Sequence, residues 1–162
     1  MRRIITFIFL LTACISLQAE GRLFHITRIK NANIIAYDVN LKDGKLDMDK
    51  PIHPYWVRYA EEPVTTAELT YIQRKLAYGY KIVSKGNNEV TVKLTAYNER
   101  SIRVCYHKGK WVGIVKINGK DCVLNRIHVQ TKPNNSLSVI YIELFGTLLN
   151  SSTSLSEKIY NN

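Results

Sequence analysis

The sequence predicts a mainly β protein: a single antiparallel β-barrel or curved β-sandwich on which one α-helix packs. Apolar and polar residues alternate along most of the chain, as where Val90, Val92 and Leu94 are separated by polar neighbours. Such alternation is typical of a sheet with one face in water. Short turn signals separate the alternating stretches, and only residues 66–77 carry apolar residues at helical spacing instead.

Three strands are expected before the helix, over residues 22–29, 33–40 and 55–60. Asn31 and Asn33 mark a turn after the first strand, because asparagine tolerates left-handed backbone and bonds its own chain. Pro51 and Pro54 keep the chain extended as it enters the third strand, which is rich in aromatic and β-branched residues.

The helix is expected over residues 66–77. Thr65 and Glu68 have the spacing of a reciprocal N-terminal cap, in which each side chain bonds a free backbone N–H of the first turn. Gly79 stands where a helix commonly ends in a left-handed turn. One face of this helix is apolar, and we expect the sheet to bury it: Leu69, Ile72 and Leu76.

The strands after the helix are expected within residues 80–84, 89–97, 101–131 and 137–144. The third of these stretches has the pattern of a β meander, with turns at Lys108-Gly109-Lys110 and at Asn118-Gly119. Serine, threonine and asparagine dominate from Asn150 onward. We therefore expect one β-rich domain over residues 20–149 and a flexible C-terminal tail over residues 150–162.

Residues 1–19 have the pattern of an export signal: Arg2 and Arg3, then an apolar run, then small residues. Two processing routes are open. Cys14 ends a segment similar to a bacterial lipobox, which predicts a lipid anchor on this cysteine. Ordinary cleavage after Ala19 is the route that we favour. Both routes predict export, to the periplasm or the outer-membrane surface. The apolar run of the signal is too short to remain as a membrane-spanning helix, so we expect no transmembrane helix after the signal is removed.

The formal net charge is +10, and without Arg2 and Arg3 it is 21 basic minus 13 acidic residues, or +8. A basic protein of this kind can attract nucleic acid, an anionic membrane or acidic glycans. The basic residues are scattered singly, however, and no dense tract resembles a nucleic-acid arm. We expect a solvated basic surface and no nucleic-acid partner.

Cys105 and Cys122 are expected to be free, although an exported protein meets oxidising conditions. Turns at Gly109 and Gly119 place Cys105 opposite Val112, and Cys122 opposite Val115. One strand then separates the two cysteines, a distance of about 9.5 Å. A disulfide needs Cα atoms closer than about 7 Å.

No catalytic or metal-binding motif is evident. The four histidines lie far apart in the sequence, without the close partners of a zinc site: His25, His53, His107 and His128. We therefore expect no metal and no cofactor. A hydrolase remains an alternative, which would have to use Asp38 or Asp49 with His53, or Cys105 with His107 or His128.

Aromatic residues around the helix are the best candidate for a binding surface, because they offer flat apolar faces with a polar edge. Gln73 adds an amide beside the apolar face of the helix. The candidate ligand-binding residues are Tyr55, Trp56, Tyr59, Gln73, Tyr78, Tyr80 and Trp111. They predict a noncatalytic protein that binds an amphiphile, a glycan or an envelope protein. The alternatives are ordinary core packing and a structural envelope component without a pocket.

Several short segments resemble an exported bacterial family, domain of unknown function 4833. The resemblance covers roughly residues 22–145. It rests on Phe24-His25-Ile26-x-Arg28, Asn31-x-Asn33, Tyr37-Asp38-x-Asn40, Tyr55-Trp56, Leu69 and Ala77-Tyr78-Gly79. The last of these is the most distinctive. The resemblance implies an envelope location and transfers no catalytic role to any residue.

Overall fold

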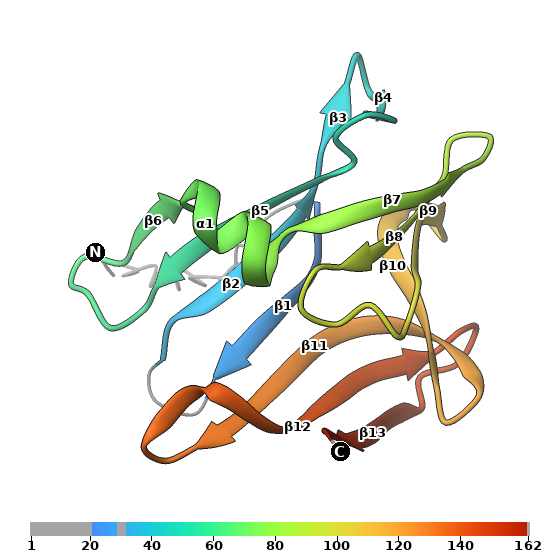
Figure 1. Ribbon diagram of the computed structural model, residues 1–162. Coiled ribbons are helices and arrows are strands. Elements are labelled where there is room, and N and C mark those ends of the chain that lie inside the picture. The colour runs from blue at the N-terminus through green and yellow to red at the C-terminus, as the bar shows by residue number, and fades with distance from the viewer. Residues whose placement is uncertain (1–20, 29–31, 162) are drawn as a thin grey trace, which may run out of the picture.

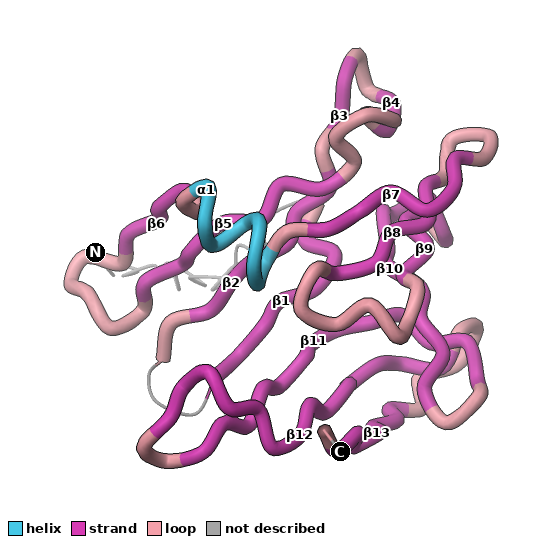
Figure 2. Tube along the Cα trace, viewed as in Figure 1, coloured by secondary structure: helices cyan, strands magenta, loops and turns pink. Residues whose placement is uncertain are grey.

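The computed structural model describes residues 21–28 and 32–161. The predicted leader lies outside these residues, and so do both predicted processing sites, Cys14 and the bond after Ala19. The predicted mainly β fold is confirmed: strands make up most of the described chain, and a single helical segment accompanies them (Figure 2). No helix within the described residues is long and apolar enough to cross a membrane.

A curled, half-barrel sheet forms the body of the protein (Figure 1). Its strands follow one another in space in the order β6-β5-β2-β1-β11-β10-β9-β8-β7, and β12 and β13 extend it from β11. Before the helical segment lie β1 (Arg22–Arg28), β2 (Ile34–Val39), β5 (Ile52–Arg58) and β6 (Thr65–Glu68). After it lie β7 (Tyr80–Lys85), β8 (Val90–Leu94), β9 (Ile102–His107), β10 (Lys110–Ile117), β11 (Lys120–Lys132), β12 (Asn135–Leu148) and β13 (Ser154–Tyr160). A separate hairpin consists of β3 (Leu41–Lys42) and β4 (Lys45–Leu46).

Strand β11 joins the two halves of the sheet. Its first part pairs with β10 in an antiparallel hairpin, where Ile117 lies opposite Lys120. Its later part pairs in parallel with β1, where Ile26 lies opposite Ile127. The described strands pair antiparallel everywhere else. A register shift in the pairing of β11 with β12 lies between Leu124 and Arg126, where β11 passes from one neighbour to the other.

The helical segment is shorter than predicted and starts later. It consists of α1 (Tyr71–Gln73) and a π-helical continuation, η1 (Arg74–Tyr78). The predicted cap was wrong, because Thr65 and Glu68 lie in β6, which pairs with β5. The capping box is instead made by Thr70 and Gln73, each of which accepts the other's backbone N–H.

The predicted buried face was also wrong. Leu69 is 2% exposed, but it precedes the helical segment. Ile72 is 65% exposed and Leu76 is 68% exposed. Leu69 lies between β6 and the N-cap Thr70, so the three residues do not share one face of a helix.

Gly79 ends the helical segment for a different reason from the predicted left-handed turn. Its backbone is extended, with φ −76° and ψ −176°, and its N–H donates to the carbonyl oxygen of Arg74 at 3.0 Å. A Cβ atom at this position would lie 2.2 Å from that oxygen. Only a residue without a side chain fits this close approach of the backbone.

Tyr37 connects the core to the end of the helical segment. The fully buried ring of Tyr37 stacks on Phe24, with ring centroids 4.5 Å apart. Its hydroxyl donates to the carbonyl oxygen of Tyr78 at 2.9 Å. This bond satisfies one of the carbonyl groups that a helix end leaves without an intrahelical partner.

The C-terminal region forms a strand where we predicted a flexible tail. β13 pairs with β12 along its whole length, from Thr147 opposite Ser154 to Tyr141 opposite Tyr160. Arg100 and Glu157 form a bidentate ion pair that links β13 to the β8–β9 loop, residues 95–101. The prediction relied on the serine-rich composition and did not use Leu155 and Ile159, which are half-buried at alternating positions of this strand.

The registers predicted around the cysteines are confirmed: Cys105 lies opposite Val112, and Cys122 opposite Val115. Both thiols are free and buried. The pKa of each thiol is raised, mainly because the thiol is buried. A thiol reacts as its thiolate, so both groups are poorly reactive in the folded protein.

We expect neither Cys105 nor Cys122 of the native protein to react with iodoacetamide at pH 7.5 within minutes. Both should react after unfolding in urea without a reductant, because no disulfide has to be broken. Peptide mass spectrometry measures the two labels separately. Labelling of either residue at the same rate in native and unfolded protein would contradict its burial.

Candidate functional site

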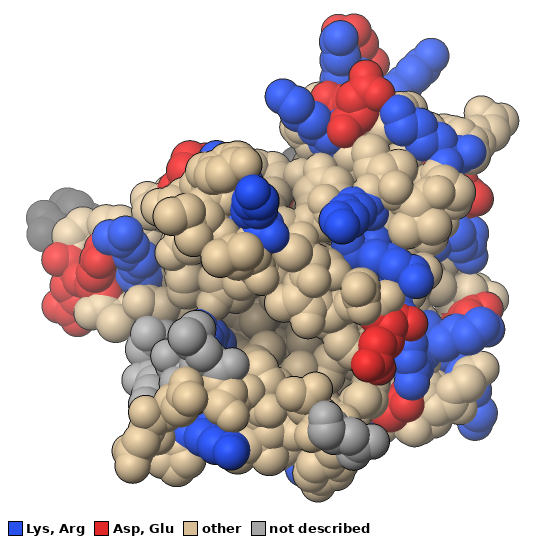
Figure 3. Space-filling model, viewed as in Figure 1, with Lys and Arg blue, Asp and Glu red and all other residues tan. Residues whose placement is uncertain are grey.

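An apolar hollow of about 360 Å³ opens on the inner side of the sheet. The helical segment and the β8–β9 loop form one side of it, and β1, β11, β12 and β13 form the other. Figure 3 shows this hollow near the centre of the face, with almost no charged side chain inside it. Its apolar lining includes Ile26, Leu94, Ile127, Val129, Val139 and Ile142.

The strand register builds the floor of the hollow. Side chains two residues apart on a strand point to the same face. β1 therefore presents Ile26 and Arg28 together, and β11 presents Ile127 and Val129. The parallel pairing places Ile26 opposite Ile127, and Arg28 opposite Val129. Two alternating strands thus give one continuous apolar surface with a single cation at its end.

Arg28 and Tyr78 form the polar edge of this surface. Nη1 of Arg28 donates to the hydroxyl oxygen of Tyr78 at 2.8 Å. The Tyr78 ring meets Trp56 edge-on, with ring centroids 5.7 Å apart, and its carbonyl accepts from Tyr37. Because the Tyr78 oxygen accepts from a cation, its own proton is well placed to be donated to an anionic group.

Tyr97 brings a second polar group to the hollow. Its hydroxyl oxygen is buried, and it has no hydrogen-bond partner among the residues that the structure describes. Burial is the main cause that raises the pKa of this phenol, so the group stays protonated at neutral pH. A buried hydroxyl without a partner costs about 1–3 kcal/mol. A ligand or a water molecule that bonds this hydroxyl would recover part of that energy.

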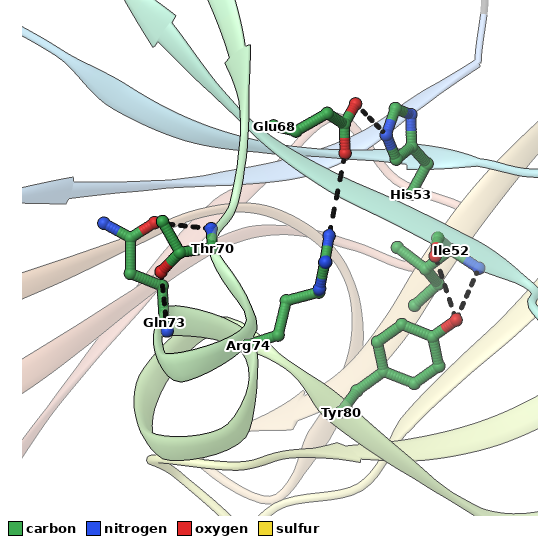
Figure 4. Close-up of polar contacts among 7 residues, drawn as sticks. All are labelled: Ile52, His53, Glu68, Thr70, Gln73, Arg74 and Tyr80. Carbon is green, nitrogen blue, oxygen red and sulfur yellow. Dashed lines mark hydrogen bonds and ion pairs between the residues drawn. The ribbon is translucent and has the colours of Figure 1, made fainter.

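A separate polar cluster holds the start of the helical segment (Figure 4). His53 Nε2 lies 2.7 Å from Oε1 of Glu68, and Oε2 of the same carboxylate lies 3.8 Å from Nη1 of Arg74. Glu68 thus connects β5 to the helical segment. The first helical turn is fixed further by the capping box of Thr70 and Gln73.

The residues of the hydrolase alternative make other contacts. Asp38 Oδ2 accepts from the hydroxyl of Tyr55 at 2.7 Å, and its Oδ1 pairs with Arg22. The contact of His53 is Glu68. Asp49 accepts from Lys85 at 2.7 Å.

The two histidines that the cysteine alternative would use have the following surroundings. His128 Nδ1 lies 3.0 Å from the hydroxyl of Thr27. His107 Nε2 is buried without a hydrogen-bond partner among the described residues. The described residues contain no group of three potential metal ligands among His, Cys, Asp and Glu.

The seven predicted ligand-binding residues do not line one pocket. Tyr78 lines the hollow, and Trp56 packs against the ring of Tyr78. The hydroxyl of Tyr80 is occupied by both backbone groups of Ile52, at 3.3 Å and 2.9 Å. The other four lie elsewhere: Tyr55 in the Asp38 cluster, Gln73 in the capping box, Tyr59 exposed, and Trp111 against Tyr106.

Sequence reasoning did not select Arg28 or Tyr97. Arg28 belongs to the first segment of the family resemblance and Tyr78 to the last. Arg28 could have been identified by assuming that the first and last of these segments lie together in the folded protein. Tyr97 was placed in the predicted strand over residues 89–97, but β8 ends at Leu94 and Tyr97 lies in the loop that follows.

A family model described as Domain of unknown function (DUF4833) matches residues 24–158. The match runs from β1 into β13 and includes the residues of β1, β11 and β12 that line the hollow, whereas Ile159 and Tyr160 of β13 lie beyond it. No curated protein and no solved structure matches the chain.

Proposed function

The chain belongs to the family Domain of unknown function (DUF4833), and on that premise we propose that it is a noncatalytic protein that binds an anionic amphiphile in the hollow. The hydrocarbon part lies on the apolar floor between β1, β11 and β12. The anionic head lies at the edge formed by Arg28 and Tyr78. The observation that carries the proposal is this apolar hollow with a cation at one end.

The size and lining of the hollow support a small ligand. Small-molecule sites commonly measure about 300–1,000 Å³ and are mainly apolar, with a few polar groups that orient the ligand. A hollow of 360 Å³ fits one alkyl chain or a compact ring system. A glycan fits this lining less well, because its hydroxyl groups would lose their hydrogen bonds to water on apolar side chains.

The polar groups at the two positions, Arg28 with Tyr78 and Tyr97, bind different parts of the ligand. The guanidinium of Arg28 and the hydroxyl of Tyr78 suit a carboxylate, sulfonate or phosphate group. The hydroxyl of Tyr97 bonds a second polar atom of the ligand or an accompanying water.

The proposal includes export to the periplasm or the outer-membrane surface, on the pattern of residues 1–19. Mass spectrometry of the protein purified from its own cells tests this part. A mature N-terminus at Glu20 supports ordinary cleavage, and a lipidated N-terminal Cys14 supports a membrane anchor. An intact N-terminus would contradict export by either route.

Isothermal titration calorimetry with three ligands of equal chain length tests the binding site. Dodecanoate, dodecanol and dodecyltrimethylammonium are titrated below their micellar concentrations. We expect dodecanoate to bind most tightly, at one site per chain, and the cation most weakly. Equal binding of all three ligands would contradict a role of Arg28 in recognition.

Replacement of Arg28 by glutamine should weaken dodecanoate binding at least about tenfold, or about 1.4 kcal/mol, and change dodecanol binding little. Tyr78→Phe, which removes only a hydroxyl, should weaken dodecanoate binding severalfold. Arg103→Gln, a control with the same loss of charge on β9, should bind like the native protein.

Val139→Trp should abolish binding because the larger side chain fills the hollow. Tyr106→Trp on the exposed side of β9 is the matched control and should bind normally. If Val139→Trp folds and binds dodecanoate with native affinity, the hollow is not the site and the proposal is wrong.

A further inference from the structure

The helical segment exposes three large apolar side chains together: Tyr71, Ile72 and Leu76. Each of them is at least 65% exposed. Single exposed apolar residues are ordinary on protein surfaces, but a contiguous group marks an interaction site more often. This group stands at the rim of the hollow, because Leu76 also lines it.

Basic side chains accompany this apolar group. The ammonium of Lys75 lies 5.7 Å from the ring centroid of Tyr71, which places a cation on the exposed side of the segment. β7 continues directly from the segment, and there Lys81 lies opposite Lys93 of β8. Like charges opposite one another destabilise a strand pair. The described residues provide no acidic partner for these three lysines.

The carboxylate of Glu68 is already paired with other groups. Glu68 lies just before the segment, and its two oxygens face His53 and Arg74. In Figure 3, Lys and Arg side chains stand on the tan surface above the hollow. The surface is therefore both apolar and cationic.

We propose that Tyr71, Ile72 and Leu76, with Lys75, Lys81 and Lys93, dock the protein on a bilayer that contains anionic phospholipid. Apolar side chains of a short amphipathic segment enter the boundary between headgroups and acyl chains, and lysines bind the anionic headgroups. Each cation close to such a surface strengthens the attraction to it. A second copy of the chain explains the cations less well, because it would bring like charges together.

Docking in this orientation turns the rim of the hollow toward the lipid. An amphiphile could then pass between the bilayer and the hollow without crossing water. This link to uptake rests on the proposed function, whereas the docking itself does not.

Lysine acetylation followed by mass spectrometry tests the orientation on the full chain. Vesicles of phosphatidylcholine and phosphatidylglycerol, in a ratio of roughly 7:3, are compared with vesicles of phosphatidylcholine alone, because anionic headgroups attract basic segments. Anionic vesicles should protect Lys75 and Lys81 at least about threefold, with no protection of Lys120 at the start of β11. Protection is read at single residues, so binding through the N-terminal apolar run does not imitate it.

Ile72→Glu should remove the protection and lower sedimentation with anionic vesicles about tenfold. Ile72 does not line the hollow, so this variant should bind dodecanoate normally. Leu41→Glu is the matched control, because it introduces the same charge at an exposed apolar residue of the β3–β4 hairpin.

Two results would overturn the inference. The first is equal acetylation of Lys75 with and without anionic vesicles. The second is a concentration-dependent dimer in analytical ultracentrifugation that Ile72→Glu dissociates, since the surface would then bind another copy. Failure of dodecanoate binding alone would overturn the proposed function and leave the docking standing.

Discussion

Replacement of Gly79 by alanine is expected to lower the free energy of unfolding by about 3 kcal/mol, at the upper end of the usual effect of overpacking. The new Cβ atom would lie 2.2 Å from the carbonyl oxygen of Arg74, which is backbone and cannot rotate away. Relief requires the end of the helical segment to move. Because Tyr78 precedes Gly79 and holds Arg28 at the hollow, we also expect weaker dodecanoate binding.

Urea unfolding followed by far-ultraviolet circular dichroism measures this effect. Gly44→Ala is the control, because a Cβ at this position would meet nothing within 4 Å. Gly44 has φ +73°, so alanine there carries only the strain of left-handed backbone, about 1–2 kcal/mol. A loss in Gly79→Ala no larger than that in Gly44→Ala would show that the close backbone contact does not matter.

Glu157→Gln is expected to destabilise the protein by about 2 kcal/mol at pH 7. The two oxygens of Glu157 accept from the guanidinium of Arg100, at 2.6 Å and 3.1 Å, and one also accepts from the N–H of Asn118. A glutamine side chain has one oxygen and no charge. It leaves a partly buried cation without its partner.

The same ion pair gives the effect a pH dependence. The hydrogen bond from Arg100 is the main cause that lowers the pKa of Glu157 below its ordinary value of 4.5. A carboxylate with a lowered pKa stabilises the fold above its unfolded pKa and loses this contribution as the pH falls. The difference between native protein and Glu157→Gln should therefore be full at pH 7 and shrink below pH 4.5.

Urea unfolding at several pH values measures this difference. Glu89→Gln removes the more exposed pair with Arg103 and should cost less than about 1 kcal/mol. A difference for Glu157→Gln that is constant from pH 7 to pH 3 would contradict the ion pair.

Local patterns predicted most of the strands, although not β6 or β13, and some of their registers. Asn118-Gly119 fixed the β10–β11 hairpin, because few dipeptides favour so tight a turn. With the turn at Gly109, this placed both cysteines correctly against their neighbours. These features depend only on residues close in the chain.

Pairing between distant segments was not predictable in the same way. Thr65 and Glu68 have the spacing of a helix cap, yet they form β6 because β5 offers an edge to pair with. Tertiary pairing outweighs a local capping preference of about 1 kcal/mol. The parallel contact of β1 with β11 leaves no periodic trace in the sequence.

The hollow was predictable only in part, for the same reason. Tyr78 was among the predicted ligand-binding residues, while Arg28 and Tyr97 were not. Several separate elements bring these side chains together, so no single stretch of sequence contains the site. Aromatic composition alone also selected Tyr80, whose hydroxyl is occupied by backbone.

The parallel contact of β1 with β11 sets an order of assembly. Thr27 and His128 touch across 101 positions of the chain. While the protein is being synthesised, β1 therefore has no neighbour on that edge until the ribosome has passed His128. Contacts of such long range form slowly. The sheet therefore cannot close along this edge until most of the chain has been synthesised, although β1 can already pair with β2.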